Sequence, residues 1–215
     1  MQNSRTLAAM TGAMQLGLRE RKKLDTRRAL SDAALELAFE RGLENITRDD
    51  IADRAGVSLR TFSNYFTGKY EALAYRQTER IRRSLAALRE RPSDEPLWAA
   101  ITAAVLEPLV SEGADEMAPT RKQLAEVRKL VLAPETRAAI SKDVFADWVQ
   151  VIAERTGTDP VHDLYPLLVA AVVRAVVEAA TDAYVVADPP VGITSMLRRA
   201  LAAVAAGLPE GGQHE

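Results

Sequence analysis

The chain has 215 residues, of which 47% are apolar, with 28 Lys and Arg against 30 Asp and Glu. This balance is typical of a soluble globular protein, and the absence of cysteine excludes disulfides, a thiol nucleophile and a thiolate metal site. Alternating β-branched patterns are scarce while Ala, Leu, Val, Arg and Glu are abundant, so we expect an all-α fold.

The first segment is weakly patterned. Residues 1–18 show little hydrophobic periodicity, and we expect them to form a flexible N-terminal arm. Apolar residues then recur at helical spacing from about residue 25, which predicts a first helix that runs to Arg41. Gly42 ends this helix, because glycine is the usual residue just beyond a helix C-terminus.

A basic cluster lies at the start of this region. Its members are Arg19, Arg21, Lys22, Lys23, Arg27 and Arg28. Residues 1–90 hold 17 Lys and Arg against 12 Asp and Glu, a net charge of +5, whereas residues 91–215 have a net charge of −7. The asymmetry indicates a polyanionic partner for the N-terminal part, with chance segregation as the alternative. Arg21, Lys22 and Lys23 are therefore candidate DNA contacts, to phosphates or in the minor groove, although solvated charge is the alternative interpretation.

Two short helices are predicted next, joined by a turn at Gly56. Thr47 opens the first of them, with Asp50 three positions later as in a capping box. Gly56 tolerates the positive φ that the turn requires. Ser58 caps the second helix, whose two Phe residues lie four positions apart and face the core.

Two helices joined by such a turn predict a helix-turn-helix at about residues 46–65. A recognition helix in the major groove offers donors and acceptors to base edges: Asn suits adenine, Arg suits guanine, and the Thr methyl meets the thymine methyl. A hydroxyl and an ammonium near the helix end can reach phosphate. The expected DNA contacts are Thr47, Ser58, Arg60, Thr61, Ser63, Asn64, Tyr65 and Lys69. An ordinary helical hairpin with a solvated face is the alternative.

The run ALELAFERGLENITRDDIADRAGVSLRTFSNYFTGKYEAL closely resembles the N-terminal domain of the TetR family of bacterial transcriptional repressors. The matched features are the Gly42 turn, the run ITRDDIADRAGVS, RTF followed by YF, and Lys69 at the start of the fourth helix. The resemblance covers about residues 25–73. Two positions depart from the family pattern: Ser63 stands where an aromatic residue is frequent, and Gly68 stands where Ser usually caps the fourth helix.

This resemblance implies a three-helix DNA-binding domain, a long connecting helix, and a helical C-terminal domain that binds an effector and forms a homodimer. We place the DNA-binding domain at residues 19–68 and the effector-binding and dimerisation domain at residues 69–215. The connecting helix is predicted from Lys69 to about Glu90, before the Pro-rich break at residues 92–96. Further helices are predicted near 95–111, 119–132, 134–156, 160–186 and 192–207.

The C-terminal part carries a second resemblance. The run IAERTGTDPVHDLYPLLVAAVVRAVVEAA is similar to the actinobacterial subgroup that includes the mycofactocin-system regulator, some members of which respond to acyl-CoA-like ligands. The apolar helix faces and aromatic residues of this part predict a largely hydrophobic effector, an acyl chain or a fused-ring compound, and the similarity makes an acyl-CoA the specific expectation. Trp98, Phe145 and Trp148 are the candidate wall residues, with ordinary core as the alternative. The basic residues expected to meet the CoA phosphates are Arg121, Lys122, Arg128 and Lys129.

The Ala-rich helix from Pro160 and the last helix are the candidate dimer seam, with monomer core as the alternative. Uncharged stretches such as residues 164–173 are well short of the roughly 20 residues that span a bilayer, and no signal peptide is apparent, so we expect a cytoplasmic protein without membrane contact.

No catalytic constellation is apparent in the sequence. It lacks a Gly-rich phosphate loop, a nucleophile elbow and a His-Glu-x-x-His pattern, and neither His162 nor His214 has a partner at metal-ligand spacing. We therefore expect no enzyme activity, cofactor or metal. The function predicted is a ligand-responsive transcriptional repressor. The alternative is a helical binding or scaffold protein that retains the DNA-binding domain without repressing.

Overall fold

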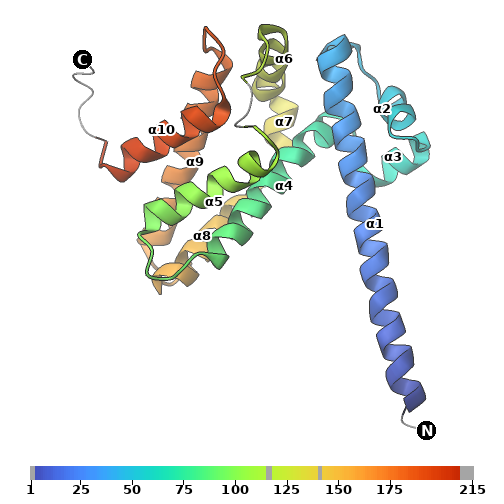
Figure 1. Ribbon diagram of the computed structural model, residues 1–215, viewed down its shortest axis with the longest axis horizontal. Helices are drawn as coiled ribbons and strands as arrows, with labels where there is room; N and C mark the ends of the chain where they lie inside the picture. The colour runs from blue at the N-terminus through green and yellow to red at the C-terminus, as the bar shows by residue number, and fades with distance from the viewer. Residues whose placement is uncertain (1–2, 115–117, 140–141, 209–215) are drawn as a thin grey trace. The chain divides into compact units, whose positions relative to one another are not determined.

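The computed structural model describes residues 3–114, 118–139 and 142–208, and the side chains within these ranges from residue 17 onwards, except those of 137–139, 142 and 143. The described residues form helices and connecting turns, and no strand occurs among them (Figure 1). The all-α prediction is confirmed. The chain divides into two compact units, Met1–Arg76 and Gln77–Glu215. The division falls inside the connecting helix, whereas the sequence interpretation placed it at the start of that helix.

The N-terminal unit contains three α-helices, a 3-10 turn and the beginning of a fourth helix. They are α1 (Asn3–Arg41), η1 (Leu43–Asn45), α2 (Arg48–Arg54), α3 (Leu59–Tyr65) and the first turns of α4 (Lys69–Glu90). The two short helices and the full extent of α4 agree with the sequence interpretation, and η1 was not predicted.

The first helix is longer than the sequence interpretation placed it. It begins at Asn3, so the backbone of residues 3–18 is helical where a flexible arm was expected; residues 1 and 2 lie outside the described part of the chain. Residues 3–41 contain no Pro and many Ala, Leu, Met, Arg and Glu, which are strong helix formers. Hydrophobic periodicity reports a buried face, so helix propensity alone gives no periodic signal. Residues 18–25 of α1 are exposed.

The core of the N-terminal unit forms where α1, α2 and α3 meet. Its largest fully buried side chains are Leu30, Leu37, Ile46, Ile51 and Phe62. The Phe62 ring centroid lies 5.9 Å from that of Phe66, and the Phe66 ring meets Tyr75 of α4 edge to face at 5.6 Å. This aromatic row ties α3 to the first turns of α4 and leaves the opposite side of α3 in solvent.

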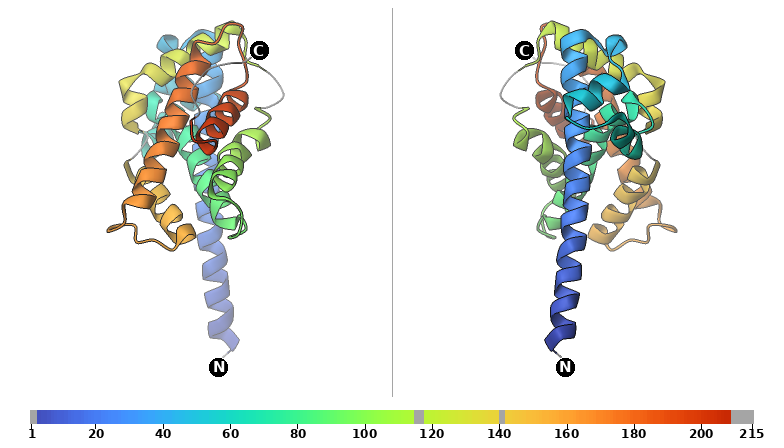
Figure 2. Two further views of the ribbon diagram at one scale, coloured as in Figure 1. Left: turned by 90° about the vertical axis from the view of Figure 1, so that its left-hand side faces the viewer. Right: turned by 90° about the vertical axis from the view of Figure 1, so that its right-hand side faces the viewer.

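The C-terminal unit continues α4 and adds six helices among the described residues. They are α5 (Leu97–Ser111), α6 (Arg121–Leu132), α7 (Pro134–Ala139), α8 (Lys142–Thr156), α9 (Leu164–Val185) and α10 (Ile193–Ala205). A single helix was predicted over residues 134–156, of which residues 140 and 141 lie outside the described part. Helices α9 and α10 lie side by side, and α10 also packs on α5 (Figure 2).

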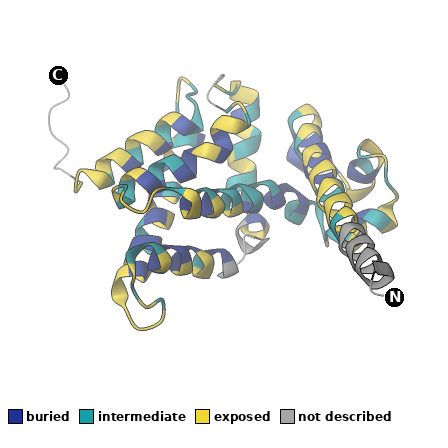
Figure 3. Ribbon diagram, turned by 60° about the horizontal axis from the view of Figure 1, so that its bottom comes forward, coloured by how far each residue is buried: buried dark blue, intermediate teal, exposed yellow. Residues whose placement is uncertain are grey.

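One apolar cluster holds the C-terminal unit together. Among its most deeply buried members are Leu88 of α4, Ile101 of α5, Ile152 of α8 and Leu201 of α10. Buried and exposed residues alternate along these helices (Figure 3), as expected for helices that each present one face to a shared core.

Helix α9 is long and apolar enough to cross a membrane by length and composition, with a mean hydropathy of 1.7 over its most apolar window. Arg174, Glu178 and Asp182 interrupt its sequence, and several of its residues, such as Val169 and Val173, are buried in the C-terminal core. Packing inside a helical unit thus accounts for part of the apolar composition of α9.

Candidate nucleic-acid interface

A capping box fixes the start of α2. The backbone N–H of Asp50 donates to Thr47 Oγ1 at 3.2 Å, and the backbone N–H of Thr47 donates to Asp50 Oδ2 at 2.9 Å. The hydroxyl and backbone N–H of Thr47 hold the pKa of Asp50 below its ordinary value, because both donate to the charged carboxylate. The capping pair predicted from the sequence is confirmed, and the Thr47 side chain is exposed at the same end of the helix.

The turn and the start of α3 are fixed in the same local way. Gly56 adopts a φ of +68°, in the left-handed region that favours glycine. Ser58 Oγ then accepts from the backbone N–H of Thr61 at 3.1 Å and lies 2.9 Å from Thr61 Oγ1. Ser58 therefore caps α3 as predicted, and the two hydroxyls partner each other.

The exposed face of α3 lies opposite its buried Phe. Phe62 is fully buried, whereas Arg60, Ser63 and Asn64 are exposed and lie at positions i, i+3 and i+4, which share one side of a helix. Within the described part of the chain, these three side chains make no hydrogen bond or ion pair. Their donors and acceptors are thus available to an outside partner. Tyr65 is half-buried at the edge of this face.

Ion pairs hold α2 against α1. Arg54 of α2 donates to Glu40 Oε2 at 2.6 Å and to Glu36 Oε2 at 3.3 Å, and Arg41 lies 3.1 Å from Asp50. The hydrogen bond from Arg54 is the main cause that lowers the pKa of Glu40. Surface ion pairs contribute little to stability, but the two-oxygen contact of Arg54 with Glu40 restricts how α2 lies on α1. Sequence reasoning missed these positioning residues because the partners are far apart in the chain.

Lys69 has partners inside the protein that the sequence did not reveal. Its Nζ donates to the carbonyl oxygen of Leu43 at 2.9 Å and to that of Ile46 at 3.1 Å, and it lies 5.6 Å from the Tyr70 ring centroid. Two of its three donors therefore tie the start of α4 to the segment ahead of α2. A contact with DNA phosphate can use only the remaining donor, so Lys69 is first of all a positioning residue.

The basic cluster occupies a helix rather than a loose arm. Arg21, Lys22 and Lys23 are exposed on α1. Successive side chains of a helix point about 100° apart, so these three point in different directions around the helix axis. Arg27 is half-buried and its guanidinium lies 5.7 Å from the Tyr75 ring centroid, which gives it a packing role. The three consecutive residues remain the candidates for phosphate contact.

The three aromatic residues expected to contact an effector belong to the C-terminal core. Trp148 is 8% exposed within the apolar cluster, and Trp98 and Phe145 are half-buried against it. The Arg174 guanidinium covers the Phe145 ring at 4.6 Å. The structure thus brings the three side chains to one cluster, and their contact with a ligand stays a prediction.

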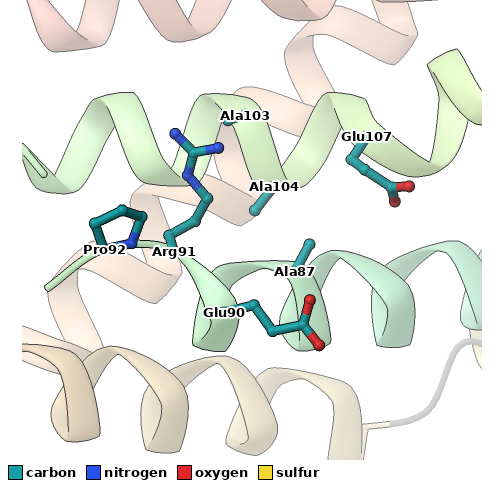
Figure 4. Close-up of a pocket in the computed structure, with 7 residues that line it drawn as sticks. All are labelled: Ala87, Glu90, Arg91, Pro92, Ala103, Ala104 and Glu107. Carbon is teal, nitrogen blue, oxygen red and sulfur yellow. The ribbon is translucent and has the colours of Figure 1, made fainter.

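A cleft of about 280 Å³ lies between the end of α4 and α5 and is lined by other residues. Its lining residues are Ala87, Glu90, Arg91, Pro92, Ala103, Ala104 and Glu107. Figure 4 shows the carboxylates of Glu90 and Glu107 on the two helices that border it. The described lining contains no aromatic residue and two carboxylates, so this cleft does not match the expected site for an anionic, long-chain ligand.

The described residues contain no group of three or more His, Asp or Glu that could hold a metal ion. His162 is exposed and its Nδ1 lies 3.1 Å from Asp159 Oδ1 in the loop before α9. His214, the other histidine, lies outside the described residues.

Two family models match the chain. The model described as "Bacterial regulatory proteins, tetR family" matches residues 30–74, and the one described as "MftR C-terminal domain" matches residues 95–209, more than half of the chain. The chain belongs to the TetR family. It is a transcriptional regulator and not an enzyme, as predicted, and both parts of the resemblance drawn from its sequence are confirmed.

Known TetR-family proteins resemble the chain over most of its length. The HTH-type transcriptional regulator TcmR of Streptomyces glaucescens is 32% identical over 165 residues, which are 74% of this chain and 73% of TcmR. The transcriptional regulator MftR of Mycobacterium tuberculosis is 28% identical over 192 residues, or 87% of this chain and 93% of MftR. The fold is similar to that of Thermus thermophilus FadR, with a TM-score of 0.54, 20% identity, and coverage of 87% of this chain and all of FadR.

TetR-family regulators are cytoplasmic proteins that bind DNA operators and dimerise. In this TetR-family chain, the helix-turn-helix is formed by α2 and α3, and the family match to residues 30–74 includes both helices and the first turn of α4. The basic residues at positions 21–23 precede the matched segment, so they are a feature of this chain outside the match.

Proposed function

We propose that this regulator is a cytoplasmic repressor that binds a palindromic double-stranded DNA operator as a homodimer and leaves it when a small hydrophobic effector binds. The DNA-binding part of this proposal rests on the face formed by Arg60, Ser63 and Asn64 on α3. These side chains are exposed, unpaired in the described part of the chain, and opposite a buried Phe62 that anchors the helix.

The chemistry of this face fits base edges in the major groove. Arg60 can donate two hydrogen bonds to guanine, and Asn64 can both donate to and accept from adenine. Thr61 lies at the side of the face, and its methyl group suits a thymine methyl. A two-fold dimer presents the same helix twice, so we expect an operator with two inverted half-sites one helical turn of DNA apart.

Arg60→Ala and Asn64→Ala are each expected to lose roughly 1–3 kcal/mol of discrimination at particular base pairs, because each bidentate contact reads one base. The measurement is selection of bound sequences from a random DNA pool, with the wild type and each variant in parallel. Arg128→Ala, which removes an exposed guanidinium from α6, is the matched control and should select the wild-type operator. Unchanged base preference in both α3 variants would remove these residues from sequence readout.

Lys69→Met and Lys22→Met should distinguish a lysine that stabilises the fold from one that contacts DNA phosphate. Each substitution removes one ammonium group and keeps an apolar side chain of similar length. Lys69→Met is expected to lower the free energy of unfolding by roughly 1–3 kcal/mol, because two carbonyl oxygens lose their donor. Lys22→Met should leave stability within about 0.5 kcal/mol and reduce the slope of log affinity against log salt by about one for each half-site. Urea unfolding and salt-dependent DNA binding measure the two quantities, and the opposite pattern would reverse the two roles.

The homodimer is supported by an exposed stripe on α9. Its apolar residues are the exposed Leu164, Leu168, Ala175 and Ala179, the half-buried Ala171, and Val186 just beyond the helix end. The exposed Asp182 lies on the same side, between Ala179 and Val186. Leu164, Leu168 and Val186 are 71%, 53% and 62% exposed, an unusual exposure for a row of apolar side chains. The small residues between them permit close approach of a partner helix, and Ala202 and Ala206 are exposed on the neighbouring α10 segment.

The effector part of the proposal rests on a similar fold and on the apolar cluster of the C-terminal unit. The solved Thermus thermophilus FadR is a complex with lauroyl-CoA, and its fold is similar to that of this chain. The apolar cluster with Trp98, Phe145 and Trp148 is the part of the C-terminal unit best suited to an acyl chain. Among the basic residues of α6, Arg121 pairs with Asp188 at 2.7 Å and Lys129 with Glu126 at 2.9 Å, so CoA phosphates would compete with these carboxylates.

A scaffold protein that keeps the DNA-binding domain without repressing is the second candidate. The two candidates differ in whether the protein binds DNA specifically and changes transcription. A gel shift with DNA from upstream of its own gene, followed by a reporter fused to that DNA, separates them. Specific binding with lower reporter expression supports the repressor.

A further inference from the structure

Two arginines of α4 donate hydrogen bonds to a single carboxylate at the end of α5. Arg80 donates to Glu112 Oε2 from Nε at 2.9 Å and from Nη2 at 2.7 Å, and Arg83 Nη1 donates to Glu112 Oε1 at 2.8 Å. Arg83 also donates to the hydroxyl of Ser111. Both oxygens of Glu112 are thus occupied from one face of α4. The Glu112 side chain is 20% exposed and the Arg80 side chain 26% exposed, so water screens the pair less than at an open surface.

The backbone holds Glu112 in place. It is the C-cap residue of α5, and Gly113 follows with a φ of +75°. The N–H groups of Gly113 and Ala114 donate to the carbonyl oxygens of Val110 and Leu109, both at 2.9 Å, which is the Schellman pattern of a helix end. The backbone position of Glu112 is therefore set by the end of α5 and does not depend on the arginines.

A carboxylate at a helix C-terminus is unfavourable by itself, because that end of the helix dipole carries partial negative charge. Two guanidinium groups offset both the charge and the dipole. Burial raises the pKa of Tyr184 of α9, and the charge of Arg80 opposes that rise. The hydrogen bonds to Glu112 thus hold the middle of α4 where α5 ends.

The C-terminal end of α4 is held by different chemistry. Arg155 of α8 donates to the backbone carbonyl oxygens of Arg91 at 3.2 Å, Pro92 at 2.6 Å and Glu95 at 3.0 Å. Arg89 of α4 adds an ion pair with Glu154 at 3.2 Å. None of these contacts involves Glu112, so the two attachments of α4 can be separated by mutation.

We propose that Glu112, with Arg80 and Arg83, is a latch that fixes the middle of α4 in the C-terminal unit, and that its opening weakens operator binding. The second half of this statement rests on the proposed function. Helix α4 continues without a break from Arg83 back to Lys69, which ties it to the helix-turn-helix segment. With the latch open, α4 samples more orientations, and the orientation that binds DNA becomes a smaller fraction of the population.

The first measurement needs no DNA. In the full chain, Glu112→Gln should raise amide hydrogen exchange at least about ten-fold over residues 77–84, with exchange over residues 86–90 unchanged because Arg155 still holds that end. Glu107→Gln is the matched control. Glu107 borders the cleft of Figure 4 and reaches Arg83 only at 3.8 Å, so its neutralisation should change neither segment.

A double variant and a triple variant distinguish loss of this contact from a general loss of folding. Arg80→Gln/Arg83→Gln should raise exchange over the same residues as Glu112→Gln, and combining all three changes should add little, because the groups act as one unit. Unchanged exchange in Glu112→Gln, or additive effects in the triple variant, would overturn the latch.

The second measurement is the dissociation constant for the selected operator, which Glu112→Gln should raise at least about five-fold while Glu107→Gln leaves it unchanged. Faster exchange with unchanged operator affinity would overturn the regulatory role and keep the mechanical one. If the wild type binds no DNA, the proposed function fails and the regulatory role fails with it. The exchange data still decide whether Glu112 holds α4.

Discussion

Two glutamates on the exposed stripe of α9, in the variant Ala175→Glu/Ala179→Glu, should convert the proposed dimer into monomers that keep their fold. Both alanines are exposed in the single chain, so the substitutions bury nothing within it. In a two-fold interface each change occurs twice, which places four carboxylates at one seam. Burying unpaired charge is strongly unfavourable, and we expect the dissociation constant of the dimer to rise on the order of 1,000-fold, or about 4 kcal/mol.

Sedimentation over a range of concentrations measures the dimer, and thermal unfolding monitors the fold of each chain. Ala125→Glu introduces the same side chain at an exposed alanine of α6 and should leave a dimer. Operator binding should fall together with dimerisation, since a monomer contacts only one half-site. A dimer that survives both glutamates would show that the α9 stripe is not the interface, and the exposed row of apolar residues would need another partner.

The helix-turn-helix could be predicted because its signals are local. The pairs Thr47 with Asp50 and Ser58 with Thr61 are each three residues apart, and the turn depends on one glycine. Helix caps and turns of this kind are determined by neighbouring residues, so they can be read in a sequence without knowing the fold.

The contacts that position these helices could not be predicted. Lys69 meets carbonyl oxygens 26 and 23 residues away, and Arg80 meets a carboxylate 32 residues away. Lys69 therefore looked like a free ammonium at a helix start. The same limit applies to Trp148, because core and ligand wall use the same apolar residues and only packing distinguishes them. The helical N-terminus was missed for another reason: the sequence there has helix-forming residues but no hydrophobic periodicity.

Acyl-CoA esters of increasing chain length should release the regulator from its operator at progressively lower concentrations. Each buried methylene contributes about 0.8 kcal/mol, so about four more methylenes, from octanoyl- to dodecanoyl-CoA, should tighten binding by about 3 kcal/mol, or roughly 200-fold. The gain should stop where the chain outgrows the apolar cluster. Free CoA, which keeps the phosphates and lacks the chain, is the control and should release little DNA.

The two tryptophans of the chain make the contact measurable. If the acyl chain lies against Trp148, titration should quench fluorescence in Trp98→Phe, where Trp148 is the remaining tryptophan; Trp148→Phe reports Trp98 in the same way. The coupling must be reciprocal, so saturating operator should weaken acyl-CoA binding by the factor by which acyl-CoA weakens operator binding. If no acyl-CoA of any chain length quenches the fluorescence or releases the DNA, acyl-CoA is rejected as the effector. Quenching without release would mean that the ligand binds the DNA-bound and free states equally and therefore does not regulate DNA binding.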